Sequence, residues 1–441
     1  MSSYSDTPAR SAEPAFLSDT DPDYRKLEER QGLLRDSTPW RVAGFQGAEQ
    51  IHSSLRELYC DNAFEFSGGP TSMEHMKQAL IVEFSKPFPT RYEAPEFYLL
   101  LVWEDLLIRN FLATTDPRSD LKLTQRPLVG TLPSMSLNAC TIKTTGSSKT
   151  LIAVNWGVYV VLISMVELAL ETVKIEIDPS GKTFSIFGNE EEFRQRLHAM
   201  PQMKEQLIHL LLFYYGGEKV DPNACSSKSS KALFWFGSIS RAMGLFVLAH
   251  EYGHVLANHD SEMAINSSGH GSETLVHSWA QELEADIIGH NLMSYVLERA
   301  ASEVPRQNVL LGFHLVAPLF YFICVRIVEE AEYIVQHGGE LPSGPSLLEI
   351  SEARNTLDFA FKHLLDGRWK EPSVVSALSR YSDHPPGWLR WESAQIYFER
   401  EFRDLKQHGF TGVGIALASN MQELWEETMP EFARIVKEHA R

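Results

Sequence analysis

The segment 250–254 reads H-E-x-x-H and constrains the fold of this chain more than any other feature. Small and apolar residues fill 242–249 before it and 255–257 after it, which predicts a helix buried on nearly all sides. His250 and His254 lie one turn apart on such a helix, so both imidazoles can reach one metal ion. Burying two histidines without a partner would be costly, so we expect a metal there rather than a pair of hydrogen-bonded core histidines.

A third protein ligand is expected, because catalytic zinc sites generally combine three protein ligands with a water. In segment 281–286, Glu282 and Asp286 are four residues apart and share a helical face, whereas Glu284 points elsewhere. We expect Glu282 to complete a His-His-Glu set and Asp286 to accept the outer N–H of a metal-bound imidazole. Ala285 would let the two helices approach closely. The alternative interpretation of this segment is a solvated acidic face.

Other histidines near the motif remain alternatives for the third ligand, namely His270, His277 and His290. His259 is a poorer alternative. It follows His254 by five residues, on a different helical face, and no glycine turn precedes it that would bring it round to the metal.

The H-E-x-x-H motif followed by E-x-x-x-D resembles the gluzincin zinc metallopeptidases. Two further segments are similar to the HtpX and CAAX prenyl endopeptidase family. Residues 138–140 with 151–158 resemble that family's "N-A-F … n-x-G" segment, and 382–386 with Arg390 resemble its late "H-P-P-x-x-x-R" motif. These elements occur in the family's order, from about residue 130 to residue 400.

The resemblance implies a zinc-dependent endopeptidase with one Zn²⁺ per chain and a protein or peptide substrate. Glu251 would be the general base that acts on a metal-activated water. His384 would steady the oxyanion, with Tyr381 or Asn138 as further oxyanion or substrate contacts. Arg390 would anchor the site, and the strand formed by the first segment would lie over the active-site cleft.

The spacing departs from that family, because Gly157 lies much farther before His250 than is usual there. We expect an inserted hairpin at 172–186 and further helix within the region 171–240. Two other functions remain open. One is a regulatory or phage-defence protein of the ImmA/IrrE or Lit type, which cleaves a single partner. The other is a non-catalytic zinc-binding interaction module.

The expected fold is α+β and predominantly helical, a zincin-like metallopeptidase domain with a small sheet over the active-site helix. Residues 1–38 are rich in Ser, Asp, Glu and Pro, so we expect a disordered tail. Residues 39–130 are expected to form a helical N-terminal subdomain, and residues 131–441 the catalytic domain.

Composition restricts the partners and the cellular location that we expect. The net charge of −18 argues against nucleic acid as a partner, because phosphate binding needs a basic surface. The four cysteines are far apart in the chain, and no apolar leader opens it, so we expect a cytoplasmic protein. The uncharged stretch 309–325 leaves membrane association as an alternative, although it falls slightly short of the about 20 residues of a typical span.

Overall fold

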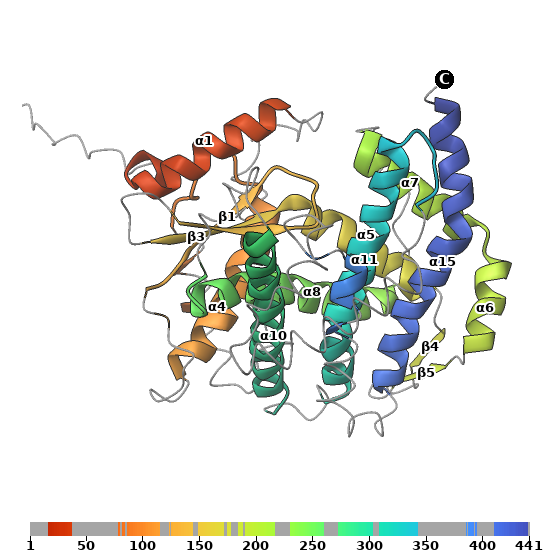
Figure 1. The fold of residues 1–441 in the computed structure, drawn as a ribbon. Coiled ribbons are helices and arrows are strands. Elements are labelled where there is room, and N and C mark those ends of the chain that lie inside the picture. The colour runs from red at the N-terminus through yellow and green to blue at the C-terminus, as the bar shows by residue number, and fades with distance from the viewer. Residues whose placement is uncertain are drawn as a thin grey trace, which may run out of the picture.

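The computed structural model describes a mostly helical chain with a small sheet, as the α+β expectation requires (Figure 1). The described residues are 16–37, 78–79, 82–83, 86–114, 123, 125–143, 149–171, 174–177, 184–187, 190–216, 230–259, 272–302, 308–342, 385, 387–391, 393–394 and 410–439. The named helices are η1 (Leu17–Asp19), α1 (Pro22–Ser37), α4 (Pro95–Thr114), α5 (Trp156–Glu171), α6 (Glu190–Ala199), α7 (Gln202–Gly216), α8 (Ser230–Leu256), α10 (Ser272–Ser302), α11 (Asn308–Gln336) and α15 (Phe410–His439). The strands are β1 (Leu128–Leu132), β2 (Ala139–Lys143), β3 (Thr150–Asn155), β4 (Lys174–Ile177) and β5 (Phe184–Phe187).

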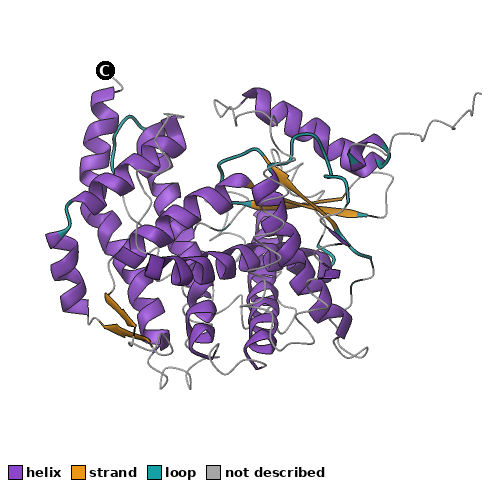
Figure 2. Ribbon diagram, turned by 180° about the vertical axis from the view of Figure 1, so that it is seen from behind, coloured by secondary structure: helices purple, strands orange, loops and turns teal. Residues whose placement is uncertain are grey.

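The larger sheet has the strand order β1-β3-β2, with β3 parallel to β1 and antiparallel to β2. Successive side chains of a strand point to opposite faces, and both faces are covered here. Ile152 and Val154 of β3 join the main helical core, whereas Leu151 and Ala153 pack in a second cluster with Tyr24 and Leu27 of α1. The sheet therefore lies between α1 on one side and the helical core that contains α8 on the other (Figures 1 and 2).

The prediction of a disordered tail is wrong for residues 16–37. Leu27 and Gln31 of α1 are fully or almost fully buried. The Gln31 side-chain amide donates to the carbonyl of Thr131 at 2.6 Å and to Glu93 Oε1 at 3.0 Å. Burial of an apolar side chain and a satisfied polar group at one contact holds the helix, despite its polar composition.

The predicted boundary at residue 130 is also wrong, because it falls inside β1 and separates parts of one core. Leu101 and Ile108 of α4 belong to the same cluster as the residues of α5 and α8. Asp105 of α4 also contacts α8, because its carboxylate accepts the hydroxyl of Tyr252, and it pairs with Arg109 at 2.8 Å. Helix α4 therefore supports the H-E-x-x-H helix directly and is no separate subdomain.

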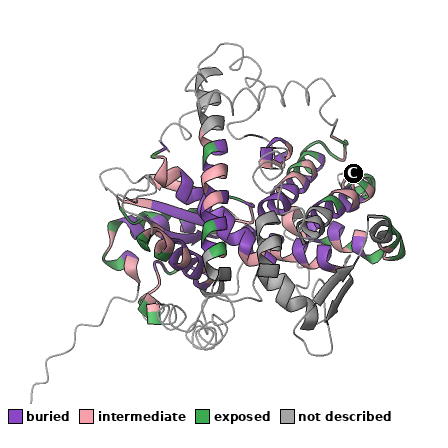
Figure 3. Cartoon of the chain, turned by 90° about the horizontal axis from the view of Figure 1, so that it is seen from below, coloured by how far each residue is buried: buried purple, intermediate pink, exposed green. Residues whose placement is uncertain are grey.

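Helix α8 runs through the middle of the molecule (Figure 1), where buried residues gather (Figure 3), and every residue of 242–253 is buried. It packs against α5, α10 and α11 as well as against β2 and β3. The prediction of a buried helix around the motif is confirmed. A segment that carries His250 and Glu251 in such an interior needs partners for both groups.

The inserted region contains the predicted hairpin, since β4 and β5 pair antiparallel, followed by helices α6 and α7. The apolar stretch 309–325 lies in α11, whose described side chains from Ala317 to Cys324 are all buried. None of the helices, over the part of the chain that the structure describes, has the length and apolar character needed to cross a membrane.

Candidate metal centre

Small residues allow α8 and α10 to cross in backbone contact, and this crossing forms the site. A Cβ added to Gly253 would lie 2.9 Å from the carbonyl oxygen of Ala285, and one added to Gly289 would lie 2.7 Å from the backbone nitrogen of His250. Neither contact is tolerable for a real side chain, because the obstructing atoms are backbone. The prediction that Ala285 permits close approach is confirmed, and the two glycines complete the contact.

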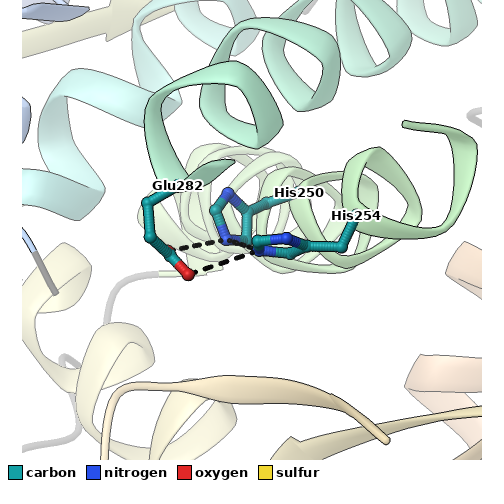
Figure 4. A group of neighbouring side chains, drawn as sticks. All are labelled: His250, His254 and Glu282. Atoms are coloured by element: carbon teal, nitrogen blue, oxygen red, sulfur yellow. Dashed lines mark hydrogen bonds and ion pairs between the residues drawn. The ribbon is translucent and has the colours of Figure 1, made fainter. Parts of the chain in front are cut away.

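The crossing brings His250, His254 and Glu282 together, with one ligand atom of each within 4.8 Å of the others (Figure 4). The Nε2 atoms of the two histidines are 3.1 Å apart. Glu282 Oε2 lies 3.4 Å from His250 Nε2, and Glu282 Oε1 lies 3.5 Å from His254 Nε2. His250 and Glu282 are buried, and this group could hold a metal ion.

These separations can be compared with those between the ligands of one tetrahedrally coordinated metal ion. Ligand bonds of about 2.0–2.2 Å at tetrahedral angles put neighbouring ligand atoms roughly 3.3–3.6 Å apart. The two nitrogen–oxygen separations fall in that range, each to a different oxygen of Glu282, and the nitrogen–nitrogen separation is slightly shorter. Two imidazole nitrogens and a carboxylate in one buried spot need a positive charge between them, and a divalent cation is a suitable one.

Asp286 lies one turn after Glu282 on α10 and contacts the first histidine. Its Oδ1 is 2.8 Å from His250 Nδ1, where it can accept the N–H and leave Nε2 for the metal. Arg390 donates to the same carboxylate, with Nε 2.9 Å from Oδ2, and its Nη1 is 3.9 Å from Glu282. The guanidinium also lies over the ring of Phe322, 4.8 Å from its centroid. Arg390 therefore holds both carboxylates, as an anchoring residue would.

The pKa values of the two histidines differ because their surroundings differ. Burial opposes the charging of His250, but the hydrogen bonds and charges of Asp286 and Glu282 outweigh it and raise the pKa to about 10. Burial lowers the pKa of His254 to about 3, and the neighbouring His250 charge adds to that effect. In the absence of a metal, His250 is therefore the protonated one of the two histidines, and a metal ion at Nε2 would displace that proton.

The carboxylate of Glu251 contacts the sheet. Its carboxylate Oε2 accepts the hydroxyl of Thr141 at 2.7 Å, and Thr141 lies on β2. Tyr321 of α11 donates to the carbonyl of Leu137 at 2.8 Å and fixes the loop that enters β2. Sequence reasoning missed Thr141, whose only signal was its place in alternation with Ala139 on the strand that the family resemblance sets over the cleft.

His259 is no member of the ligand group, as expected, but its contact with that group was not predicted from the sequence. Its Nδ1 lies 2.9 Å from Nδ1 of His254, and its Nε2 lies 3.1 Å from Glu284 Oε2. Glu284, expected to point away from the metal, does so and meets His259 instead. A histidine just beyond the helix end was the available signal.

The remaining predicted site residues have different outcomes. Asn138 is exposed at the start of β2, where its side-chain oxygen accepts the N–H of Ala139 at 2.8 Å, so its predicted substrate contact stays a prediction. Tyr381 and His384 lie outside the described residues, as does the alternative ligand His270. His290 is buried on α10 and is no member of the three-residue group.

Comparisons with family models, with curated proteins and with solved structures find no match for this chain.

Proposed function

We propose that this chain is a zinc-dependent endopeptidase with a zincin-like fold, of the gluzincin type and resembling the HtpX and CAAX prenyl endopeptidase family. The observation that carries the proposal is the His-His-Glu group where two helices cross. Helix α8 supplies His250 and His254, α10 supplies Glu282, and β2 holds the carboxylate of Glu251, the residue next to His250 in sequence.

The donor set fits zinc, with His250, His254 and Glu282 as ligands and Asp286 and Arg390 behind them. When bound, zinc would supply a Lewis acid for the scissile carbonyl and would acidify a coordinated water. His250 and Glu282 are buried, His254 is partly buried, and a second layer of contacts fixes the ligands, as in metal sites that keep their shape.

Glu251 is the proposed general base. It follows a ligand in sequence, and its carboxylate contacts β2, the strand beside which a substrate would bind. It takes the proton of the attacking water as the new carbon–oxygen bond forms. It then passes this proton to the leaving amine nitrogen as the peptide bond breaks.

Strand β2 supports a peptide as the substrate. It is an edge strand of the β1-β3-β2 sheet, and no described strand pairs with its outer side. An extended peptide can add to such an edge by main-chain hydrogen bonds, which would carry its backbone past Glu251. His384 remains the proposed oxyanion group of this mechanism, aided by Tyr381.

The test of the proposal is Glu251→Gln in the full chain. We expect it to abolish cleavage while the zinc content stays at the wild-type value, because the change removes the base and no ligand. Peptide products would be measured by mass spectrometry after incubation with a proteome-derived peptide library and with native cell extract. A Glu251→Gln chain that cleaves as fast as wild type would show the assignment to be wrong.

The same experiment separates the other functions. Cleavage of one extract protein with no cleavage of library peptides would indicate a single-partner peptidase of the ImmA/IrrE or Lit kind. Zinc binding without any cleavage would indicate a binding module. Glu251 argues against the module, since a scaffold has no need of a buried carboxylate beside its metal ligands.

A further inference from the structure

The end of helix α8 is a Schellman cap that folds the chain back onto a metal ligand. Asn258 has φ 55°, in the left-handed region. The N–H of Asn258 donates to the carbonyl of Val255 at 3.2 Å, and the N–H of His259 donates to the carbonyl of His254 at 3.0 Å. This pair of bonds defines the Schellman motif, in which the residue after the left-handed one returns over the last turn.

The two residues that this cap brings together are both histidines. Schellman caps usually bury an apolar contact between these positions, whereas here the imidazole of His259 meets that of His254 at 2.9 Å between Nδ1 atoms. Glu284 of α10 fixes the outer nitrogen of His259 at 3.1 Å. His259 is only 8% exposed, so water competes little for these bonds.

These contacts determine which nitrogen of each imidazole carries the hydrogen. The Glu284 carboxylate accepts the Nε2–H of His259, so Nδ1 of that ring carries a lone pair. That lone pair accepts the Nδ1–H of His254. The Nε2 lone pair of His254 then faces His250 and Glu282, as a metal ligand requires.

We propose that His259, placed by the left-handed cap at Asn258 and held by Glu284, is the positioning residue that orients His254 for metal binding. The inference rests on the proposed zinc site and adds a second support to it, independent of the Asp286 contact to His250. Retention of the metal then depends on how α8 ends as well as on the motif within it.

The test is the zinc dissociation constant of the full chain, measured by competition with a chromogenic chelator. The visible spectrum of the cobalt-substituted chain serves as a second readout. We expect His259→Leu to weaken zinc binding by about 10- to 100-fold, the usual effect of losing an outer partner. His259→Asn keeps an acceptor oxygen at the place of Nδ1 and should recover most of that loss.

The cap is tested without touching either histidine. Asn258→Val cannot hold a positive φ without strain and should weaken zinc binding as His259→Leu does, whereas Asn258→Gly should match wild type. Glu284→Ala changes a side chain that is 48% exposed, so it should leave the fold intact and weaken zinc several-fold. This variant keeps the test decisive if His259→Leu fails to fold.

Three results would overturn the inference. Wild-type affinity and cobalt spectrum in both His259→Leu and Glu284→Ala would show that His259 does not orient His254. Equal loss in His259→Leu and His259→Asn would exclude the acceptor role. A wild-type chain that binds no zinc would instead overturn the proposed function itself, and the inference with it.

Discussion

Glu251 is oriented by a residue that the H-E-x-x-H motif does not contain. Thr141 donates its hydroxyl to the carboxylate from the edge strand, so the base of the proposed reaction depends on contact between the sheet and α8. The metal ligands follow the same rule, because Asp286 faces His250 and His259 faces His254. Glu251, His250 and His254 thus each have a partner that lies outside the motif.

Replacement of Thr141 tests the orientation of the base. Thr141→Val keeps the shape and removes the donor, so we expect kcat to fall about tenfold, the effect of one hydrogen bond to a charged group. KM and zinc content should be unchanged. Thr141→Ser restores the hydroxyl and should restore kcat. An unchanged kcat in Thr141→Val would mean that the bond has no part in catalysis.

Among the secondary-structure elements, the crossing of α8 and α10 determines the geometry of the site. Gly289 and Gly253 let α8 and α10 touch at the backbone, and this depth of contact places Glu282 against both histidines. The sheet and α4 fix α8 from other sides, through Thr141 and through the bond between Asp105 and Tyr252. A change in any of these contacts would move whole helices.

Gly289→Ala should separate the two helices. Its Cβ would meet backbone atoms of His250 at 2.7 and 2.8 Å, so we expect a loss of about 1–3 kcal/mol in unfolding free energy and weaker zinc binding. Gly32→Ala in α1 is the matched control. Its Cβ would meet only Tyr92 at 3.5 Å, so it should be neutral or stabilise by about 0.5–1 kcal/mol. Urea unfolding measures both, and equal stabilities for the two variants would contradict the close crossing.

The contact of α1 with the sheet should depend on pH through Glu93. Burial raises the pKa of Glu93 to about 7 from 4.5, against the hydrogen bonds from Thr131 and Gln31, which lower it. The folded chain therefore holds this proton more tightly than the unfolded chain does. That stability is fully present below pH 4.5 and is lost as the pH rises through 7.

Glu93→Gln removes this titration. Between pH 5 and pH 8, the unfolding free energy of wild type should fall by about 2 kcal/mol more than that of the variant. Urea unfolding at the two pH values measures the difference. Parallel pH profiles for the two chains would show that Glu93 does not titrate as proposed.

At the scale of the whole molecule, the sequence predicted the parts whose pattern is local. The buried helix of 250–254, the shared face of Glu282 and Asp286 and the hairpin of β4 and β5 each follow from spacing within one element. The close approach of α8 and α10 could be predicted in part, from Ala285, but the sequence did not indicate that Gly253 and Gly289 also face this contact.

Features that join distant segments could not be predicted in the same way. Thr141 meets Glu251 only because β2 lies against α8, and the parallel pairing of β1 with β3 has no local signature. Helix α1 was hidden by its polar composition, although Tyr24, Leu27 and Gln31 fall on one helical face and are buried together. His259 required the cap geometry at Asn258, which sequence spacing alone treats as a break.

The central claim is that α8 and α10 of one chain together hold one zinc ion. It is tested most directly by the metal content of the purified full chain, determined by elemental mass spectrometry beside His250→Ala and Glu282→Ala. We predict about one zinc per wild-type chain, the usual content of a three-ligand catalytic site, and little or none in either variant. A wild-type chain without metal after zinc is supplied, or a Glu282→Ala chain that keeps its full complement, would contradict it.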